Sequence, residues 1–104
     1  MEYSSITELD LSHQGLTELP DLSAYTNLKK LVCSANDIRH LDNLPGNLTY
    51  LDCYDNKITQ LNNLPLSLTI LFCSSNPLVY NFAPSLENIR KNSKNSNKQT
   101  KIEI

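Results

Sequence analysis

Three stretches of the chain repeat one pattern of apolar and amide residues at an interval of twenty residues. The pattern begins at Leu28, Leu48 and Leu68 and reads Leu-x-x-Leu-x-Cys-x-x-Asn-x-Ile/Leu. A looser copy begins at Ile6, 22 residues before Leu28. A fixed interval of this length is typical of stacked identical units, and it limits the fold more than any local propensity does. We therefore expect one domain built from about four units.

These residues resemble the leucine-rich repeat signature, L-x-x-L-x-L/C-x-x-N-x-L/I, and the match covers about residues 6–80. The units also end in Leu-Pro, with the prolines at Pro20, Pro45 and Pro65. This short form resembles the repeats of secreted bacterial effectors and of leucine-rich proteins from amoeba-infecting giant viruses. The resemblance implies a β-rich solenoid with a short curved parallel sheet on its concave face. It also implies an extended or turn-like convex side and little or no helix.

The expected boundaries follow the repeat. The repeat domain is placed at 1–90, with units at about 6–27, 28–47, 48–67 and 68–85, a degenerate terminal cap at 86–91, and a polar, basic, flexible tail at 92–104. The cap has two interpretations. It aligns with a fading fifth unit, which predicts a terminal strand, and we favour this interpretation. It also fits a short helix with Ser85 as its N-cap and with Leu86 and Ile89 on one face.

Two sets of in-phase residues are expected to stabilise the stack rather than to bind a ligand: the cysteines Cys33, Cys53 and Cys73 and the amides Asn36, Asn56 and Asn76. Each cysteine takes the inward position of its unit, where free cysteine packs as a small apolar group. A straight column of three thiols does not converge as a tetrahedral zinc site requires. Each amide side chain is expected to satisfy backbone groups in its own unit and in the next one.

The outward positions of the expected strands supply the candidate binding surface: Lys30, Val32, Tyr50, Asp52, Tyr54, Asp55, Ile70 and Phe72. An exposed apolar patch with a polar rim marks an interaction site, and aromatic side chains are its favoured anchors. The alternative is that the C-terminal region of the chain covers Ile70 and Phe72.

Charge and composition limit the partners that we expect. Residues 1–89 carry four basic and ten acidic groups, whereas residues 90–104 carry five basic groups and one acidic group. An acidic repeat domain disfavours nucleic acid, although the basic tail keeps that hypothesis open. No apolar run approaches the length of a membrane span, and no secretory signal is visible. Unpaired cysteines favour an intracellular, cytoplasmic location, or a host cytoplasm or virion if the protein is viral.

The sequence thus predicts a non-catalytic module that binds a partner protein through its concave face, with no cofactor and no metal. The resemblance to viral and bacterial repeats implies a factor that acts on a host protein. The alternative is a structural protein that self-associates through the open ends of the stack, forming a homo-oligomer.

Overall fold

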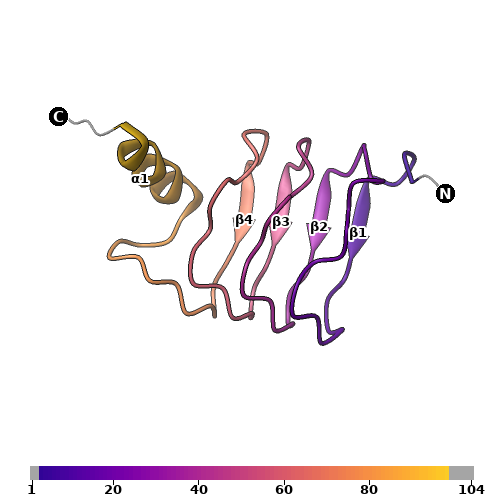
Figure 1. Cartoon of the computed structure of the whole chain (residues 1–104), viewed down its shortest axis with the longest axis horizontal. Coiled ribbons are helices and arrows are strands. Elements are labelled where there is room, and N and C mark those ends of the chain that lie inside the picture. Colours follow the sequence, from indigo (N-terminus) through magenta and orange to yellow (C-terminus); the bar gives the residue numbers. More distant parts are fainter. Residues whose placement is uncertain (1–2, 99–104) are drawn as a thin grey trace.

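The computed structural model describes residues 3–98. Its strands are β1 (Glu8–Asp10), β2 (Lys30–Val32), β3 (Tyr50–Asp52) and β4 (Ile70–Phe72), and its helix is α1 (Leu86–Lys98). The strands form one parallel sheet in the order β1-β2-β3-β4 (Figure 1). The expected parallel sheet, with one strand per unit, is confirmed.

The register of the sheet matches the repeat. Leu9 lies opposite Leu31, Leu31 opposite Leu51, and Leu51 opposite Leu71. The two additional residues of the first unit therefore lie in the connection between strands and leave the pairing in phase. This matters because a one-residue slip would move every inward side chain to the opposite face.

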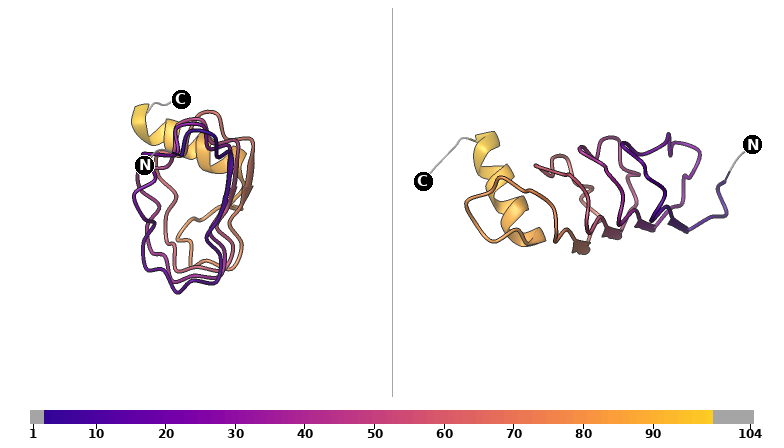
Figure 2. Two further views of the ribbon diagram at one scale, coloured as in Figure 1. Left: turned by 90° about the vertical axis from the view of Figure 1, so that its right-hand side faces the viewer. Right: turned by 90° about the horizontal axis from the view of Figure 1, so that it is seen from below.

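Successive turns of the chain follow nearly the same path when viewed along the stack (Figure 2, left). The molecule extends over 48 × 25 × 18 Å, and its long dimension runs across the strands from β1 to α1 (Figure 1). The core is a narrow column of apolar side chains between the sheet and the return segments. Its fully buried members are Leu28, Leu31, Cys33, Ile38, Leu48, Leu51, Cys53, Ile58 and Leu68.

A left-handed residue follows each strand and turns the chain away from the sheet. These residues are His13, Ala35, Asp55 and Ser75, with φ between 55° and 59°. The backbone N–H of Ala35 donates to the Tyr54 carbonyl at 2.9 Å, and that of Asp55 donates to the Ser74 carbonyl at 3.0 Å. Hydrogen bonding between units therefore continues through the turns and holds these backbone conformations in place.

The C-terminal cap differs from the structure that the sequence predicts. The predicted terminal strand at 86–91 is wrong, and the 13-residue helix α1 begins there instead. Ser85 Oγ accepts a hydrogen bond from the Asn88 N–H at 3.2 Å, as an N-cap does. Ile89 is 2% exposed, so the helix packs an apolar side chain against the end of the core.

The charge of Lys91 gives a physical reason why a helix forms here and a fifth strand does not. In the strand alignment, Lys91 would occupy the inward position that cysteine takes in the other units, and its charge would be buried without a partner. In α1, Lys91 is exposed while Ile89 faces the core. The helix also continues through residues 92–98, which are part of the predicted tail, so the described residues contain one short helix beside the parallel sheet. The remaining tail residues, 99–104, lie outside the described part of the chain.

Candidate protein-binding surface

The strands present alternate side chains to the core and to the outside of the stack. Leu31 and Leu51 point inward and are fully buried. Their strand neighbours point outward and form the candidate surface: Lys30, Val32, Tyr50, Asp52, Ile70 and Phe72. Tyr54 and Asp55 follow β3 and are exposed. The in-register sheet therefore brings all the predicted binding residues to one region.

Aromatic and cationic contacts connect the three later strands across this surface. The rings of Tyr50 and Phe72 lie 5.6 Å apart between centroids, with an interplanar angle of 54°. Lys30 Nζ lies 4.6 Å from the centroid of the Tyr50 ring. Tilted aromatic pairs and exposed cation–π pairs each contribute about 0.5–1.5 kcal/mol, so they favour this arrangement of the side chains. The Tyr50 ring therefore contacts one side chain from each neighbouring strand, Lys30 on β2 and Phe72 on β4.

Large apolar side chains at the β4 end remain accessible. Tyr54 is 48% exposed, Ile70 is 43% exposed and Phe72 is 47% exposed. The alternative that the C-terminal region covers Ile70 and Phe72 is not realised by the described residues, because α1 packs at the end of the stack (Figure 1). The surface therefore offers aromatic anchors that gain free energy when a partner buries them.

Carboxylates border these anchors. Asp52 Oδ1 accepts a hydrogen bond from the Tyr54 N–H at 3.1 Å, which fixes the start of the turn. Asp10 makes the same contact in the first unit, accepting from the Ser12 hydroxyl at 2.6 Å and from the Ser12 N–H at 2.9 Å. Those hydrogen bonds hold the pKa of Asp10 below its usual value.

The acidic border extends further than the predicted set. Glu8 and Asp10 lie on β1, in register with Lys30 and Val32, and both are exposed. Glu8 and Asp10 occupy the same repeat positions as Lys30 and Val32, so the repeat itself could have placed them in the candidate surface. The exposed apolar residues that defined that surface lie in the later units. The outward face is therefore acidic at β1 and mixed aromatic and acidic at β3 and β4.

The cysteines lie in the core column and not on this surface. Cys33 and Cys53 are fully buried, and Cys73 is 7% exposed. Burial raises the pKa of the Cys33 thiol to about 12 and raises those of Cys53 and Cys73 as well. Thiols that stay protonated and inaccessible are poor nucleophiles. Among the described residues, no cluster of histidine, cysteine and carboxylate side chains is suited to hold a metal ion.

The asparagine side chains bridge adjacent turns. Asn56 Oδ1 accepts from the Ile38 N–H at 3.0 Å, and its Nδ2 donates to the carbonyls of Cys33 and Cys53 at 3.0 and 3.1 Å. Asn36 and Asn76 make corresponding bonds to the turns that precede them: each accepts from a backbone N–H there and donates to a backbone carbonyl there. In each case the bridged turn is the preceding one, whereas the sequence analysis placed it in the next unit.

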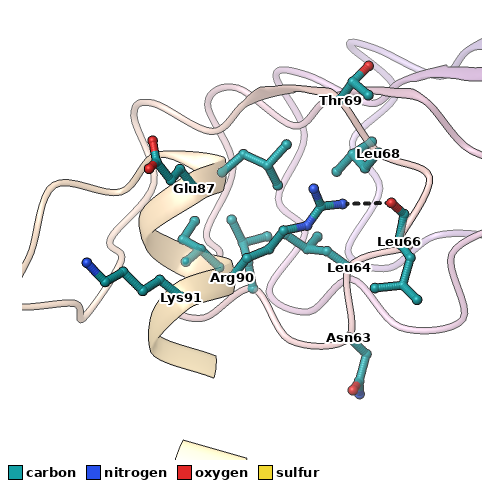
Figure 3. A pocket seen from close by; sticks show the side chains of 11 residues that line it. Asn63, Leu64, Leu66, Leu68, Thr69, Glu87, Arg90 and Lys91 are labelled. Atoms are coloured by element: carbon teal, nitrogen blue, oxygen red, sulfur yellow. Dashed lines mark hydrogen bonds between the residues drawn. The ribbon is translucent and has the colours of Figure 1, made fainter. Parts of the chain in front are cut away.

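A groove that the sequence analysis missed lies at the other end of the molecule from β1. It has a volume of about 1080 Å³ and lies between α1 and the segment 61–69 (Figure 3). The groove depends on the helical form of the cap, so an expectation of a terminal strand could not reveal it. Its lining combines leucine side chains with Arg90.

Comparison of the chain with protein-family models, with curated protein sequences and with solved structures found no match. In the described part of the chain, no helix has the length and apolar character needed to cross a membrane.

Proposed function

We propose that the chain is a leucine-rich repeat protein of the short type and that it binds a partner protein through the outward face of its sheet. The twenty-residue period and the leucine-on-leucine register support the repeat assignment. The bridging amides support it too, because each unit uses the same side chain at the same place.

The exposed group of Tyr54, Ile70 and Phe72 carries the functional proposal. A sheet face that only meets water needs short polar side chains, whereas these three large side chains are 43–48% exposed on β4 and just after β3, beside carboxylates. Partly exposed aromatic side chains with few rotatable bonds lose little entropy on binding, so they act as anchors.

The charges around the anchors indicate the chemistry of the partner. Glu8, Asp10, Asp52 and Asp55 outnumber Lys30 on this face. A partner that offers apolar side chains flanked by arginine or lysine would complement both features, and its association would be steered by charge. The role is non-catalytic: the thiols are buried and protonated, and the outward carboxylates are arranged along a surface.

The test is affinity capture from a eukaryotic cytosolic lysate with three folded forms of the protein. These are the wild type, the double variant Tyr54→Ala/Phe72→Asp, and the control Thr59→Ala/Gln60→Ala on an exposed return segment. We expect a protein that the wild type and the control retain and the double variant loses. Identical capture by all three forms would refute binding through this face.

Self-association is a second candidate, and the first unit favours it. The apolar side chains of the first unit are only partly buried: Ile6, Leu9, Leu11, Leu16 and Leu19. Their counterparts in the second unit are all buried: Leu28, Leu31, Cys33, Ile38 and Leu41. In the described residues, β1 pairs with β2 alone, so its other edge is unpaired. Light scattering tests this candidate: particle mass that grows with protein concentration supports stacking through this end, and a constant monomer mass refutes it.

A further inference from the structure

The groove between α1 and the segment 61–69 has two apolar walls. Leu64 and Leu66 line it from the turn before β4 (Figure 3). Leu86 and Ile89 line it from the helix. Ile89 is buried and belongs to the core, whereas Leu64 and Leu86 are half-buried and remain partly accessible. The groove therefore offers an aliphatic floor to a side chain from outside the molecule.

Leu66 is exceptional among the apolar residues because it is 94% exposed at the rim of this groove. The preceding unit has Gly46 at the same place, directly after the proline. The turn therefore forms without a large side chain there. The turn does not require this leucine, and its exposed side chain extends the apolar lining formed by Leu64 and Leu86 to the surface.

Arg90 supplies a positive charge on the helix side of the groove. Its Nη2 donates to the carbonyls of Pro65 and Leu66 at 2.7 and 3.3 Å, which ties the guanidinium to the turn. Figure 3 shows the second terminal nitrogen turned away from the Leu66 carbonyl. That nitrogen has no hydrogen bond within the described residues, and the buried Nε has none there either.

The surrounding charges make this end of the molecule suited to an anion. Lys91 and Arg90 border the groove together with Glu87, which leaves one net positive charge. Residues 1–89, in contrast, carry ten acidic and four basic groups. The groove therefore carries positive charge beside an acidic repeat region, and hydrogen bonds to the turn hold the Arg90 guanidinium in position.

We propose that this groove binds an extended peptide segment in which a glutamate or aspartate side chain is flanked by aliphatic residues. The carboxylate accepts a charge-assisted hydrogen bond from the second terminal nitrogen of Arg90, whereas the buried Nε is not accessible to a ligand. The flanking aliphatic side chains cover Leu66 and reach Leu64 and Leu86. This site is separate from the outward sheet face and prefers the opposite charge, so it does not depend on the function proposed above.

The experiment is an NMR titration of the isotope-labelled full chain with a capped peptide of alternating isoleucine and glutamate. The matched control peptide has glutamine in place of glutamate. We expect the acidic peptide to shift the amide signals of residues 64–69 and 86–91 and to bind about tenfold more tightly than the control, as the loss of a charge-assisted hydrogen bond predicts. Equal affinity for the two peptides, or no shift in these segments, would overturn the proposal.

Two variants test the two halves of the site. Leu66→Gly places in the turn the residue that the preceding unit already has, so the fold should be retained while binding weakens. Arg90→Gln should remove the preference of the groove for the glutamate peptide over the glutamine peptide. If Arg90→Gln does not fold, the affinity of Leu66→Gly for the acidic peptide still tests the proposal. The sheet-face variant Tyr54→Ala/Phe72→Asp should bind the acidic peptide as the wild type does. Loss of binding in that variant, or unchanged binding by Leu66→Gly, would contradict a separate groove site.

Discussion

Replacement of Asn56 by alanine should lower the free energy of unfolding more than any other substitution of a polar side chain in the described residues. Asn56 is 3% exposed and accepts a hydrogen bond from the Ile38 N–H while it donates to the carbonyls of Cys33 and Cys53. In Asn56→Ala, the Ile38 N–H loses its partner in a place that water does not reach.

The two carbonyls are affected less than the N–H group. Cys33 O also accepts from Asn36 Nδ2 at 3.0 Å, and Cys53 O also accepts from Asn76 Nδ2 at 3.0 Å. An orphaned buried N–H costs about 1–3 kcal/mol, and each lost carbonyl bond costs about 0.5–1.5 kcal/mol. The expected loss is therefore about 2–6 kcal/mol, which is a large part of the roughly 5–15 kcal/mol that holds a domain folded.

Urea denaturation followed by circular dichroism measures this loss, with Asn62→Ala as the matched control. Asn62 is exposed, and within residues 3–98 its side chain bonds only to the Gln60 side chain, at 3.4 Å, so its replacement should change stability by less than about 0.5 kcal/mol. Asn76→Ala should fall between the two, because Asn76 is half-buried and water replaces part of its bonding. An Asn56→Ala protein within about 1 kcal/mol of the wild type would refute the assigned role of the amide column.

Three further predictions concern the core, the turns and the thiols. Leu51→Ala, at a fully buried site, should cost about 2–5 kcal/mol in a urea melt, whereas Phe72→Asp should cost below about 1 kcal/mol; equal losses would contradict the assignment of the two faces. Ala35→Gly should stabilise the protein by up to about 1 kcal/mol because its φ is 55°, and the control Ala24→Gly should not; no gain at Ala35 would count against strain there. Burial raises the pKa of the Cys33 thiol from 9.0 to about 12, so the stability that its protonated form contributes is complete below pH 9 and is lost as the pH rises toward 12. The melting temperature of Cys33→Val should therefore fall less steeply than that of the wild type over this pH range, and an equally steep fall would contradict the shift.

The repeat predicted the sheet because its period determines which residues lie side by side. Once Leu31 and Leu51 are placed inward, the positions of Lys30, Tyr50 and Phe72 on the outward face follow from the alternation of a strand. The candidate surface was therefore predictable as a set of neighbours. The contacts within it, such as Lys30 over the Tyr50 ring, depend on side-chain conformations that a pattern does not contain.

The ends of the stack were harder to predict for a physical reason. A residue inside the stack has a neighbour unit on each side, whereas the stretch from Pro84 to Lys91 has only one, so the repeat no longer decides its structure. Local chemistry then decides it: the Ser85 cap and the burial of Ile89 favour a helix. The groove beside α1 and the role of Arg90 follow from that helix and were missed with it.

The direction of the amide bridges was also outside the reach of the sequence. An asparagine can bond to the unit before it or the unit after it, and the repeat is the same in both cases. The structure selects the preceding unit because Asn56 Oδ1 meets the Ile38 N–H.

The central claim is that the outward face of the sheet recognises a partner while the opposite side maintains the fold. The most direct measurement is an amide-resolved NMR titration of the labelled protein with the partner recovered by the wild type and not by Tyr54→Ala/Phe72→Asp. We expect signal changes concentrated at residues 50–55 and 70–74. Changes confined to β1 or to the return segment 57–64, with the outward face unaffected, would contradict it.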